Sequence, residues 1–522
     1  MKSSYKNALL VLAVFIVSIC ASFYPIHQKG YALWGDDLNL IEARNAAQGG
    51  TYAYENQNGV FLSSAHTAQS VKTAIPNSLT PILYRYIFQW FGTNPQVPIE
   101  ISVIMFALFN AFVCALGIKL FSPEVGFAGG LVSALMPEML LESISRGGYE
   151  FALIFLACAL FSYFYSSEKM FSPSKKRLVF TSMFFALAAL ARNAMAISFV
   201  PFILYDFWLH RNIKRSAIFL APFAIIFGLT LTSYSWLPLS NGYTATTNQP
   251  FQQVGHFFND PYTYHFNADE TVQVALAHPE TIDRTSAYFL SHWNYHVPLK
   301  QNIKAYIDAG IFYIQTVVDL IQTGGLIVLF LVLLGAFHLW RTHRKFVEFS
   351  VLWIVVWGIG LVLAQTGNNN HLVEISILLS LFTAVGFVEL GKNLSYKKTW
   401  YVIGLLAVLG NLAAADKWRL YDSYRSSKAG LVEAIVTQVP VADVPGVIAI
   451  GIHPDAAYEF AYLTNHDTIY FNPATIQELY DQKKLKAVFA QYHVSGAIGF
   501  STDLSNDIIQ QAGVPAISVS SN

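Results

Sequence analysis

Charged side chains are scarce in this chain of 522 residues: Asp, Glu, Lys and Arg make up only 12% of it, whereas 54% of its residues are hydrophobic. A soluble protein of similar length carries about 25% charged residues. Acidic and basic residues also balance, 32 against 32, so no basic surface field favours nucleic acid as a partner. The composition therefore argues against both an ordinary soluble domain and a nucleic-acid-binding protein.

Cysteine is also scarce, and its placement excludes two kinds of site. Cys20, Cys114 and Cys158 all lie inside apolar runs. They provide neither a disulfide framework nor zinc-ligand spacing, so we interpret them as small residues of a membrane-embedded core. The C-terminal region lacks a glycine-rich phosphate fingerprint of the G-x-G-x-x-G type. This favours a structural or acceptor-binding role for that region over a second catalytic centre.

Long apolar runs, in contrast, fill much of the chain up to residue 415. A helix that crosses the hydrocarbon core needs about 20 mostly apolar residues. By this rule the sequence predicts about 11 transmembrane helices. They cover residues 8–26, 99–120, 125–141, 149–166, 178–191, 194–209, 217–237, 317–340, 347–366, 372–391 and 399–415. The first run follows Lys2 and Lys6, as in a signal peptide, but its length and the lack of a small-residue cleavage site predict a retained span.

The basic residues predict the orientation of these helices. Four short loops rich in Lys and Arg, at 169–177, 211–215, 341–345 and 392–398, fall on one side of the predicted membrane. Short basic loops face the cytoplasm, so we expect the N-terminus inside and, with an odd number of spans, the C-terminus outside. Compact loops and the lack of disulfides favour a bacterial inner membrane.

Three larger segments are expected on the outer side: a first outer loop at about 27–98, a long outer loop at about 238–315, and the region 416–522. The last of these alternates short runs rich in β-branched residues, such as 446–452, with helical stretches. That alternation predicts a small α/β domain with a mostly parallel sheet. We therefore expect a polytopic α-helical membrane protein, with a transmembrane domain over 1–415 followed by an extracytoplasmic α/β domain.

The densest group of charges follows the first span. Asp36 and Asp37 are adjacent, and Glu42 and Arg44 come within the next two helical turns. A carboxylate at a membrane surface can take a proton from an acceptor hydroxyl or amine, and a second one can orient the first or hold a divalent cation. The alternative is a capped helix with a solvated acidic end, because Asp is a common N-cap.

The stretch YALWGDDLNLIEARNAAQGGTYAYEN, continuing to PNSLTPILYRYIFQWFG, resembles the first outer loop of GT-C glycosyltransferases. In particular, it is similar to the bacterial group of protein mannosyltransferases and lipid A aminoarabinose transferases. The shared landmarks are, in order, Asp36-Asp37, Gly49-Gly50, Pro76 and Pro81, and Phe91-Gly92. The chain departs from the His-Pro-Pro of that family, because it reads Leu79-Thr80-Pro81.

Two further patches carry the resemblance. A short outer loop at 136–150 resembles the family's second outer loop, where an Arg and then an acidic residue open the fourth span; these are Arg146 and Glu150 here. Arg192 occupies a hairpin where the family has Lys or Arg followed by Pro, although Asn193 replaces that Pro. Alone, an interfacial Arg and a Glu at a helix N-terminus are each ordinary features.

The resemblance implies an inverting transfer of a sugar from a polyprenyl-phosphate donor to a lipid, glycan or protein acceptor on the extracytoplasmic face. It assigns catalytic roles to Asp36, Asp37 and Glu150, with Asp36 or Asp37 as the base. Some relatives need a metal and others do not. A divalent cation, Mg or Mn, held by Asp37 and Glu150 therefore stays open, and no other cofactor is expected.

Cations are expected near the phosphate that leaves. The candidates are Arg146, Arg192, Lys72 and His371. Lys72 is as well explained as a solvated loop residue, and His371 stands where relatives have an Arg-Tyr pair. Further acceptor or loop candidates are Glu42, Arg44 and His66.

Three other functions remain open. A polysaccharide polymerase or ligase that uses a lipid-pyrophosphate glycan shares most of this chemistry. A transporter or flippase would need ionisable residues at mid-membrane or an internal repeat, and we find no convincing repeat. A binding scaffold would place the function in the C-terminal region. In every case membrane lipids surround the chain, and nucleic acid is not an expected partner.

Overall fold

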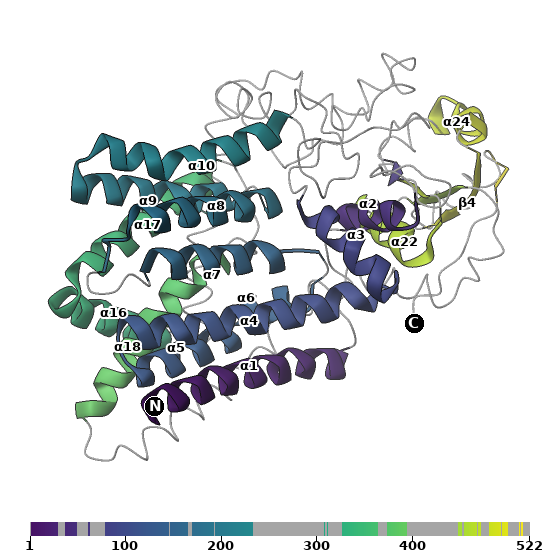
Figure 1. Ribbon diagram of the computed structural model, residues 1–522. Coiled ribbons are helices and arrows are strands. Elements are labelled where there is room, and N and C mark those ends of the chain that lie inside the picture. Colours follow the sequence, from purple (N-terminus) through teal and green to yellow (C-terminus); the bar gives the residue numbers. More distant parts are fainter. Residues whose placement is uncertain are drawn as a thin grey trace.

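The protein is described here from a computed structural model (Figure 1). The structure describes residues 2–29, 37–49, 61–62, 79–145, 147–164, 170–192, 194–232, 307, 311, 326–363, 373–393, 447–450, 454–466, 468–470, 480–491, 493–498, 511 and 513–514.

The apolar part of the chain is helical. Its helices are α1 (Lys2–Lys29), α2 (Asp37–Ala47), α3 (Leu79–Phe91), α4 (Gln96–Leu120), α5 (Pro123–Leu135), α6 (Pro137–Ser143), α7 (Glu150–Phe164), α8 (Lys175–Ala191), α9 (Met195–His210), α10 (Ile213–Thr232), α16 (Leu326–Thr342), α17 (Arg344–Leu363) and α18 (Ser376–Asn393).

Three stretches in these helices are long and apolar enough to cross a membrane: Tyr5–Phe23, Gln96–Leu120 and Val373–Lys392. Shorter apolar helices cover Glu150–Phe164, Met195–His210 and Val328–Thr342. A largely helical protein with three candidate membrane spans among the described residues is therefore confirmed, whereas the number of about 11 spans stays a prediction. The predicted span at 399–415 lies outside the described residues.

The helices form a bundle in which α1, α4, α7, α8 and α10 lie side by side, while α2 and α3 lie beyond one end of it (Figure 1). The turn between α4 and α5 shows how local sequence sets this packing. Ser122 caps α5 by accepting a hydrogen bond from the backbone N–H of Val125 at 3.2 Å, and Pro123 occupies the first turn. Gly126 then lets α5 approach α4, because a Cβ there would lie 2.5 Å from the Cys114 carbonyl oxygen.

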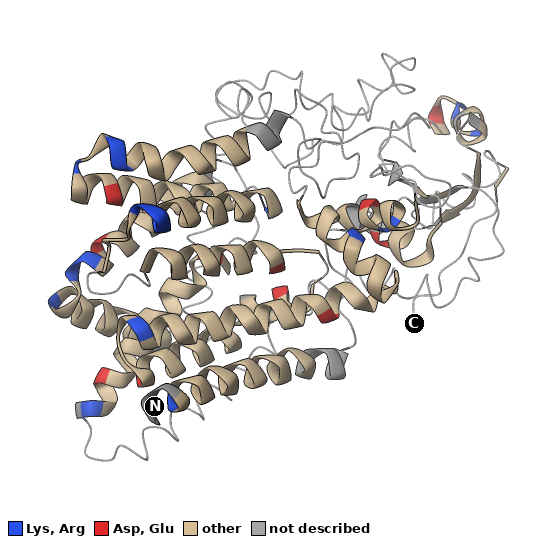
Figure 2. Ribbon diagram, in the orientation of Figure 1, with Lys and Arg blue, Asp and Glu red and all other residues tan. Residues whose placement is uncertain are grey.

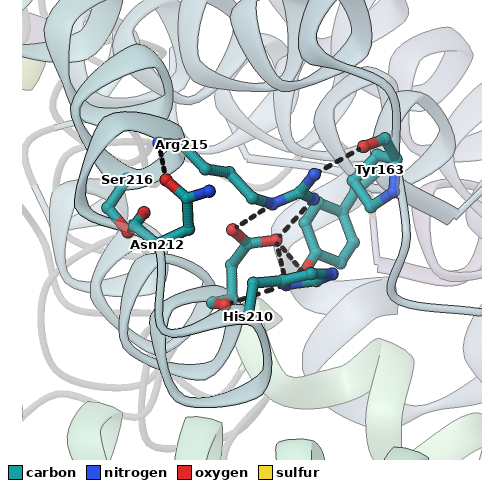
Figure 3. A network of polar contacts seen from close by, with 7 residues as sticks. Tyr163, His210, Asn212, Arg215 and Ser216 are labelled. Atoms are coloured by element: carbon teal, nitrogen blue, oxygen red, sulfur yellow. Dashed lines mark hydrogen bonds and ion pairs between the residues drawn. The ribbon is translucent and has the colours of Figure 1, made fainter.

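One buried ion pair joins the end of α9 to the start of α10 (Figure 3). Asp206 is fully buried, and Arg215 donates to both of its carboxylate oxygens, each at 2.8 Å. The guanidinium also donates to the Pro173 carbonyl at 3.1 Å, and the Tyr163 hydroxyl reaches Asp206 at 3.5 Å. The pair therefore links three parts of the bundle at the end opposite α3.

We expect Arg215→Met to lower the free energy of unfolding by about 3–5 kcal/mol, because it removes the cation that donates to both oxygens of the buried Asp206 carboxylate and leaves only His210, at 3.5 Å, as an ion-pair partner among the described residues. The thermal unfolding midpoint of the purified protein in detergent measures this effect. Lys214→Met is the matched control, since Lys214 is exposed on the same helix turn. Equal midpoints for the two variants would show that the ion pair adds nothing to stability.

A four-stranded parallel sheet lies beyond α2 and α3, in the strand order β1-β3-β2-β4 (Figure 1). Its elements are β1 (Phe61–Leu62), β2 (Val447–Ile450), α22 (Pro454–Thr464), β3 (Thr468–Tyr470), α24 (Leu485–Gln491) and β4 (Val494–Ile498). Strands and helices alternate in the last part of the chain, and an independent domain over 416–522 stays a prediction. The edge strand β1 comes from the first outer loop, which the sequence did not predict.

Lys and Arg residues gather at the end of the bundle opposite α2 and α3 (Figure 2). The helix ends there carry the basic residues at 175–177, 211–215 and 341–345. The predicted orientation requires cations at a common end, and the orientation itself stays a prediction. The cytoplasmic location of the N-terminus itself stays a prediction.

Candidate active site at the α3 end of the bundle

The helix α2 begins at Asp37, where the sequence predicts a helix start. The side chain of Asp37 and the whole of Asp36 lie outside the described residues. From Asn39 onward α2 is buried, and Asn39 has no exposed surface. Within the described part of the chain, neither amide atom of Asn39 has a hydrogen-bond partner, an arrangement that costs about 1–3 kcal/mol. A buried polar side chain therefore lies two residues after Asp37, one of the two candidates for the base.

Glu150 lies at the start of α7 and is fully buried. The hydroxyl of Tyr84, from α3, donates to Glu150 Oε1 at 2.6 Å. Burial raises the pKa of Tyr84 well above its ordinary value, and the negative charge of Glu150 raises it further. The tyrosine therefore stays protonated and acts as a hydrogen-bond donor. This contact joins the first outer loop to the residue that the resemblance assigns to the active site.

Glu142, at the end of α6 in the short outer loop, is a second buried carboxyl that the sequence analysis missed. The hydroxyl of Ser145 donates to the Glu142 carbonyl at 2.8 Å and lies 3.4 Å from Oε2. In the described part of the structure, Oε1 has no hydrogen-bond partner. Burial raises the pKa of Glu142 to about 8; the charge of Glu150 adds to this rise, and Arg192 opposes it.

Gly148 lies between these carboxyl groups. A Cβ on Gly148 would lie 3.0 Å from Ser145 Oγ and 3.2 Å from Glu142 Oε2, with Glu150 Oε2 at 3.9 Å. A side chain here would require Ser145 and Glu142 to shift by a few tenths of an ångström. The backbone at this point is therefore bordered by oxygen atoms of Ser145, Glu142 and Glu150.

The raised pKa of Glu142 predicts a pH dependence of stability. Between its ordinary 4.5 and about 8, the folded protein binds one proton more than the unfolded chain. Stability therefore falls as pH rises through this window, by up to about 1.4 kcal/mol per pH unit from this group. We expect Glu142→Gln to flatten the fall of the unfolding midpoint between pH 5 and pH 8, and the exposed Glu100→Gln to leave it unchanged. Identical profiles for wild type and Glu142→Gln would contradict this assignment.

Arg192 follows the last residue of α8 and has an extended backbone. Its guanidinium carbon lies 4.1 Å from the ring centroid of Tyr149, the residue before Glu150, which is a close cation–π contact. The hydroxyl of Thr80, at the start of α3, donates to the Ala191 carbonyl at 2.9 Å. These contacts bring the predicted hairpin cation to the same end of the bundle as Glu150.

Glu374 completes this group of buried charges, and sequence reasoning also missed it. It lies just before α18 and is fully buried. The indole N–H of Trp357 donates to Glu374 Oε2 at 2.8 Å, and the Ser198 hydroxyl donates to the same oxygen at 3.4 Å. Glu374 is also close enough to Tyr149 for an electrostatic interaction. A charge at the start of a predicted span is the one sequence signal that would have singled it out.

The other predicted site residues fall into two groups. Glu42 and Arg44 are buried on α2. Four further residues lie outside the described residues: Arg146, Lys72, His66 and His371. Among the residues that the structure describes, no group of three or more His, Cys, Asp or Glu side chains could hold a metal ion. A cation at Asp37 and Glu150 therefore stays a prediction, because one of these two side chains is not described.

No family model and no curated protein matches this chain. Several solved structures are similar to it. One is the Archaeoglobus fulgidus oligosaccharyltransferase in complex with Zn and sulfate, with a TM-score of 0.49, 12% identity and coverage of 88% of this chain. This chain spans only 62% of that protein's length.

Another of these solved structures is ArnT from Cupriavidus metallidurans bound to undecaprenyl phosphate, with a TM-score of 0.33 and 10% identity. That match covers 98% of this chain and 89% of ArnT. No residue's role is transferred from matches this loose. With both TM-scores below 0.5, the resemblance to GT-C glycosyltransferases stays a prediction from the sequence.

Proposed function

We propose that this protein is a glycosyltransferase that takes a sugar from a polyprenyl-phosphate donor and transfers it to a lipid, glycan or protein acceptor on the extracytoplasmic face. The observation that carries the proposal is the meeting of three separate segments at the α3 end of the bundle. Glu150 contacts Tyr84 of the first outer loop, and Arg192 stacks on the neighbouring Tyr149. The helix α2, which starts at Asp37, packs on α3.

The reaction needs a base, a leaving phosphate and charge neutralisation. In the proposal, Asp36 or Asp37 accepts the proton of the acceptor hydroxyl or amine, whose oxygen or nitrogen attacks C1 of the sugar. The bond between C1 and the phosphate oxygen breaks, and the configuration at C1 inverts. Polyprenyl phosphate leaves with the bonding electrons, and its growing negative charge interacts with Arg192 and Arg146.

The buried carboxyl groups have a separate role in this proposal. Glu150 is held in place by Tyr84, and Glu142 retains a proton at neutral pH because its pKa is raised to about 8. A protonated Glu142 offers a donor, and the oxygen atoms of both carboxyl groups offer acceptors, to sugar hydroxyl groups. We therefore infer that Glu142 and Glu150 bind the sugar, while the cations bind the phosphate.

A transfer assay tests the proposal. The purified protein is incubated with radiolabelled polyprenyl-phosphate sugars and with membrane lipids as acceptors, in the presence of Mg, Mn or a chelator. The proposal predicts release of sugar from one donor class, and a loss of release with the chelator would assign the cation. Donors that neither react nor bind would contradict it, and transport would then be the function to test.

A further inference from the structure

The first outer loop is attached to the C-terminal part of the chain at two points. The strand β1 pairs in parallel with β3, so that Phe61 lies opposite Thr468 and Leu62 opposite Ile469. The second point is Arg44, near the end of α2, which contacts α22. Both attachments join residues that are some 400 positions apart, so neither follows from local sequence.

Arg44 caps the C-terminal end of α22. Its Nη1 donates to the carbonyl of Tyr462 at 3.0 Å and to that of Ala461 at 3.4 Å. These carbonyls lie in the last turn of α22, which carries the negative end of the helix dipole, and the Ala461 carbonyl also accepts the backbone N–H of Asn465 at 3.0 Å. The guanidinium carbon also lies 5.7 Å from the Tyr462 ring centroid. A cation is therefore well suited to this position.

Arg44 is almost completely buried, so its guanidinium depends on the few hydrogen bonds that it makes. Only 3% of the residue is exposed, and in the described part of the chain its Nε and Nη2 have no hydrogen-bond partner. Burial lowers the pKa of Arg44, against an opposing contribution from Tyr462. Burying a cation that has few hydrogen-bond partners costs free energy. The hydrogen bonds that Arg44 makes to α22 must therefore keep their geometry.

The position of Arg44 on α2 connects this cap to the proposed base. Asp37 and Arg44 are seven residues apart, which places them on the same face of the helix and about 10 Å apart along its axis. A short helix moves as a rigid unit. The contact of Arg44 with α22 therefore fixes the rotation of α2 about its axis. It also fixes the orientation of the first helical turn, which begins at Asp37.

We propose that Arg44 is a positioning residue, through which the end of α22 holds α2 and the carboxylates of the first outer loop in their working orientation. The C-terminal part of the chain then serves as a clamp on that loop. The effect on catalysis rests on the proposed glycosyltransferase function, whereas the clamp itself does not.

Hydrogen exchange tests the clamp independently of activity. We expect Arg44→Met to increase exchange in α2 and α22 at least tenfold and to leave α4 and α7 protected, which shows that the bundle is folded. Arg44→Lys retains a cation and should restore part of the protection. Lys486→Met, an exposed change on α24, is the matched control and should leave α2 unaffected. Unchanged exchange of α2 in Arg44→Met would overturn the clamp.

Steady-state kinetics tests the positioning role. We expect Arg44→Met to lower kcat at least tenfold while KM for the polyprenyl-phosphate sugar changes less than twofold, with partial recovery in Arg44→Lys. Loss of protection in α2 with an unchanged kcat would overturn the positioning role. A wild-type protein that transfers no sugar would instead contradict the proposed function, and the exchange experiment would still decide the clamp.

Discussion

Asp37→Asn and Asp36→Asn are expected to give the largest losses of activity, with at least one of them slowing sugar transfer by about 100-fold to 10,000-fold. Asn has nearly the same shape as Asp but cannot accept the proton of the acceptor. Asp37 is the first residue of α2, and α2 is buried from Asn39 onward and packs on α3. Single-turnover transfer from a labelled donor measures the effect.

The control for both variants is Glu100→Gln, which neutralises an exposed carboxylate in the first turns of α4. It should transfer sugar at the wild-type rate. The unfolding midpoint of each variant separates loss of chemistry from loss of fold. Wild-type rates in both Asp variants would favour the alternative in which the acidic pair merely caps and solvates a helix end.

Arg192→Met is expected to slow transfer by about 100-fold to 1,000-fold, because the phosphate then leaves without a neutralising cation. Arg192→Lys should recover only part of the rate: Lys keeps the charge but lacks the planar fork that binds phosphate oxygens and stacks on Tyr149. The rate of release of polyprenyl phosphate measures this effect directly.

A matched control separates this role from the cation–π contact itself. Arg341 also lies 4.1 Å from an aromatic ring centroid, that of Phe337, in the last turn of α16. Arg341→Met therefore removes a contact of equal length, made by an exposed ring instead of the buried ring of Tyr149, without touching the proposed site. Equal losses of activity in Arg192→Met and Arg341→Met would show that the cation acts through stability alone.

Local sequence predicts the helices well, because apolar runs and short polar breaks depend on neighbouring residues. The break at Arg192 and Asn193 separates two predicted apolar segments, and the structure ends α8 at Ala191 and begins α9 at Met195. The edge strand β1 was not predictable in the same way. Two residues of a loop form a strand only because β3, far along the chain, offers an edge.

The candidate site also contains residues that local sequence predicts and residues that only the fold brings together. Glu150 and Arg192 were singled out from motifs, and the structure places them at the same end of the bundle. Glu142 was missed because it belongs to no local motif, and Glu374 because its place at the start of a predicted span was not weighed; both are fixed by burial near other charges. Arg44 was considered as an acceptor or loop residue, and its contact with α22 depends on residues 417 and 418 positions away.

The most direct test of the central claim uses a donor that carries one label in the sugar and another in the lipid phosphate. We predict that wild-type protein transfers the sugar label to the acceptor and leaves the second label as polyprenyl monophosphate, in equal amounts. Release of label only from a lipid-pyrophosphate glycan would indicate a polymerase or ligase instead. Labels that stay together on one molecule, even when it crosses the membrane, would contradict glycosyl transfer.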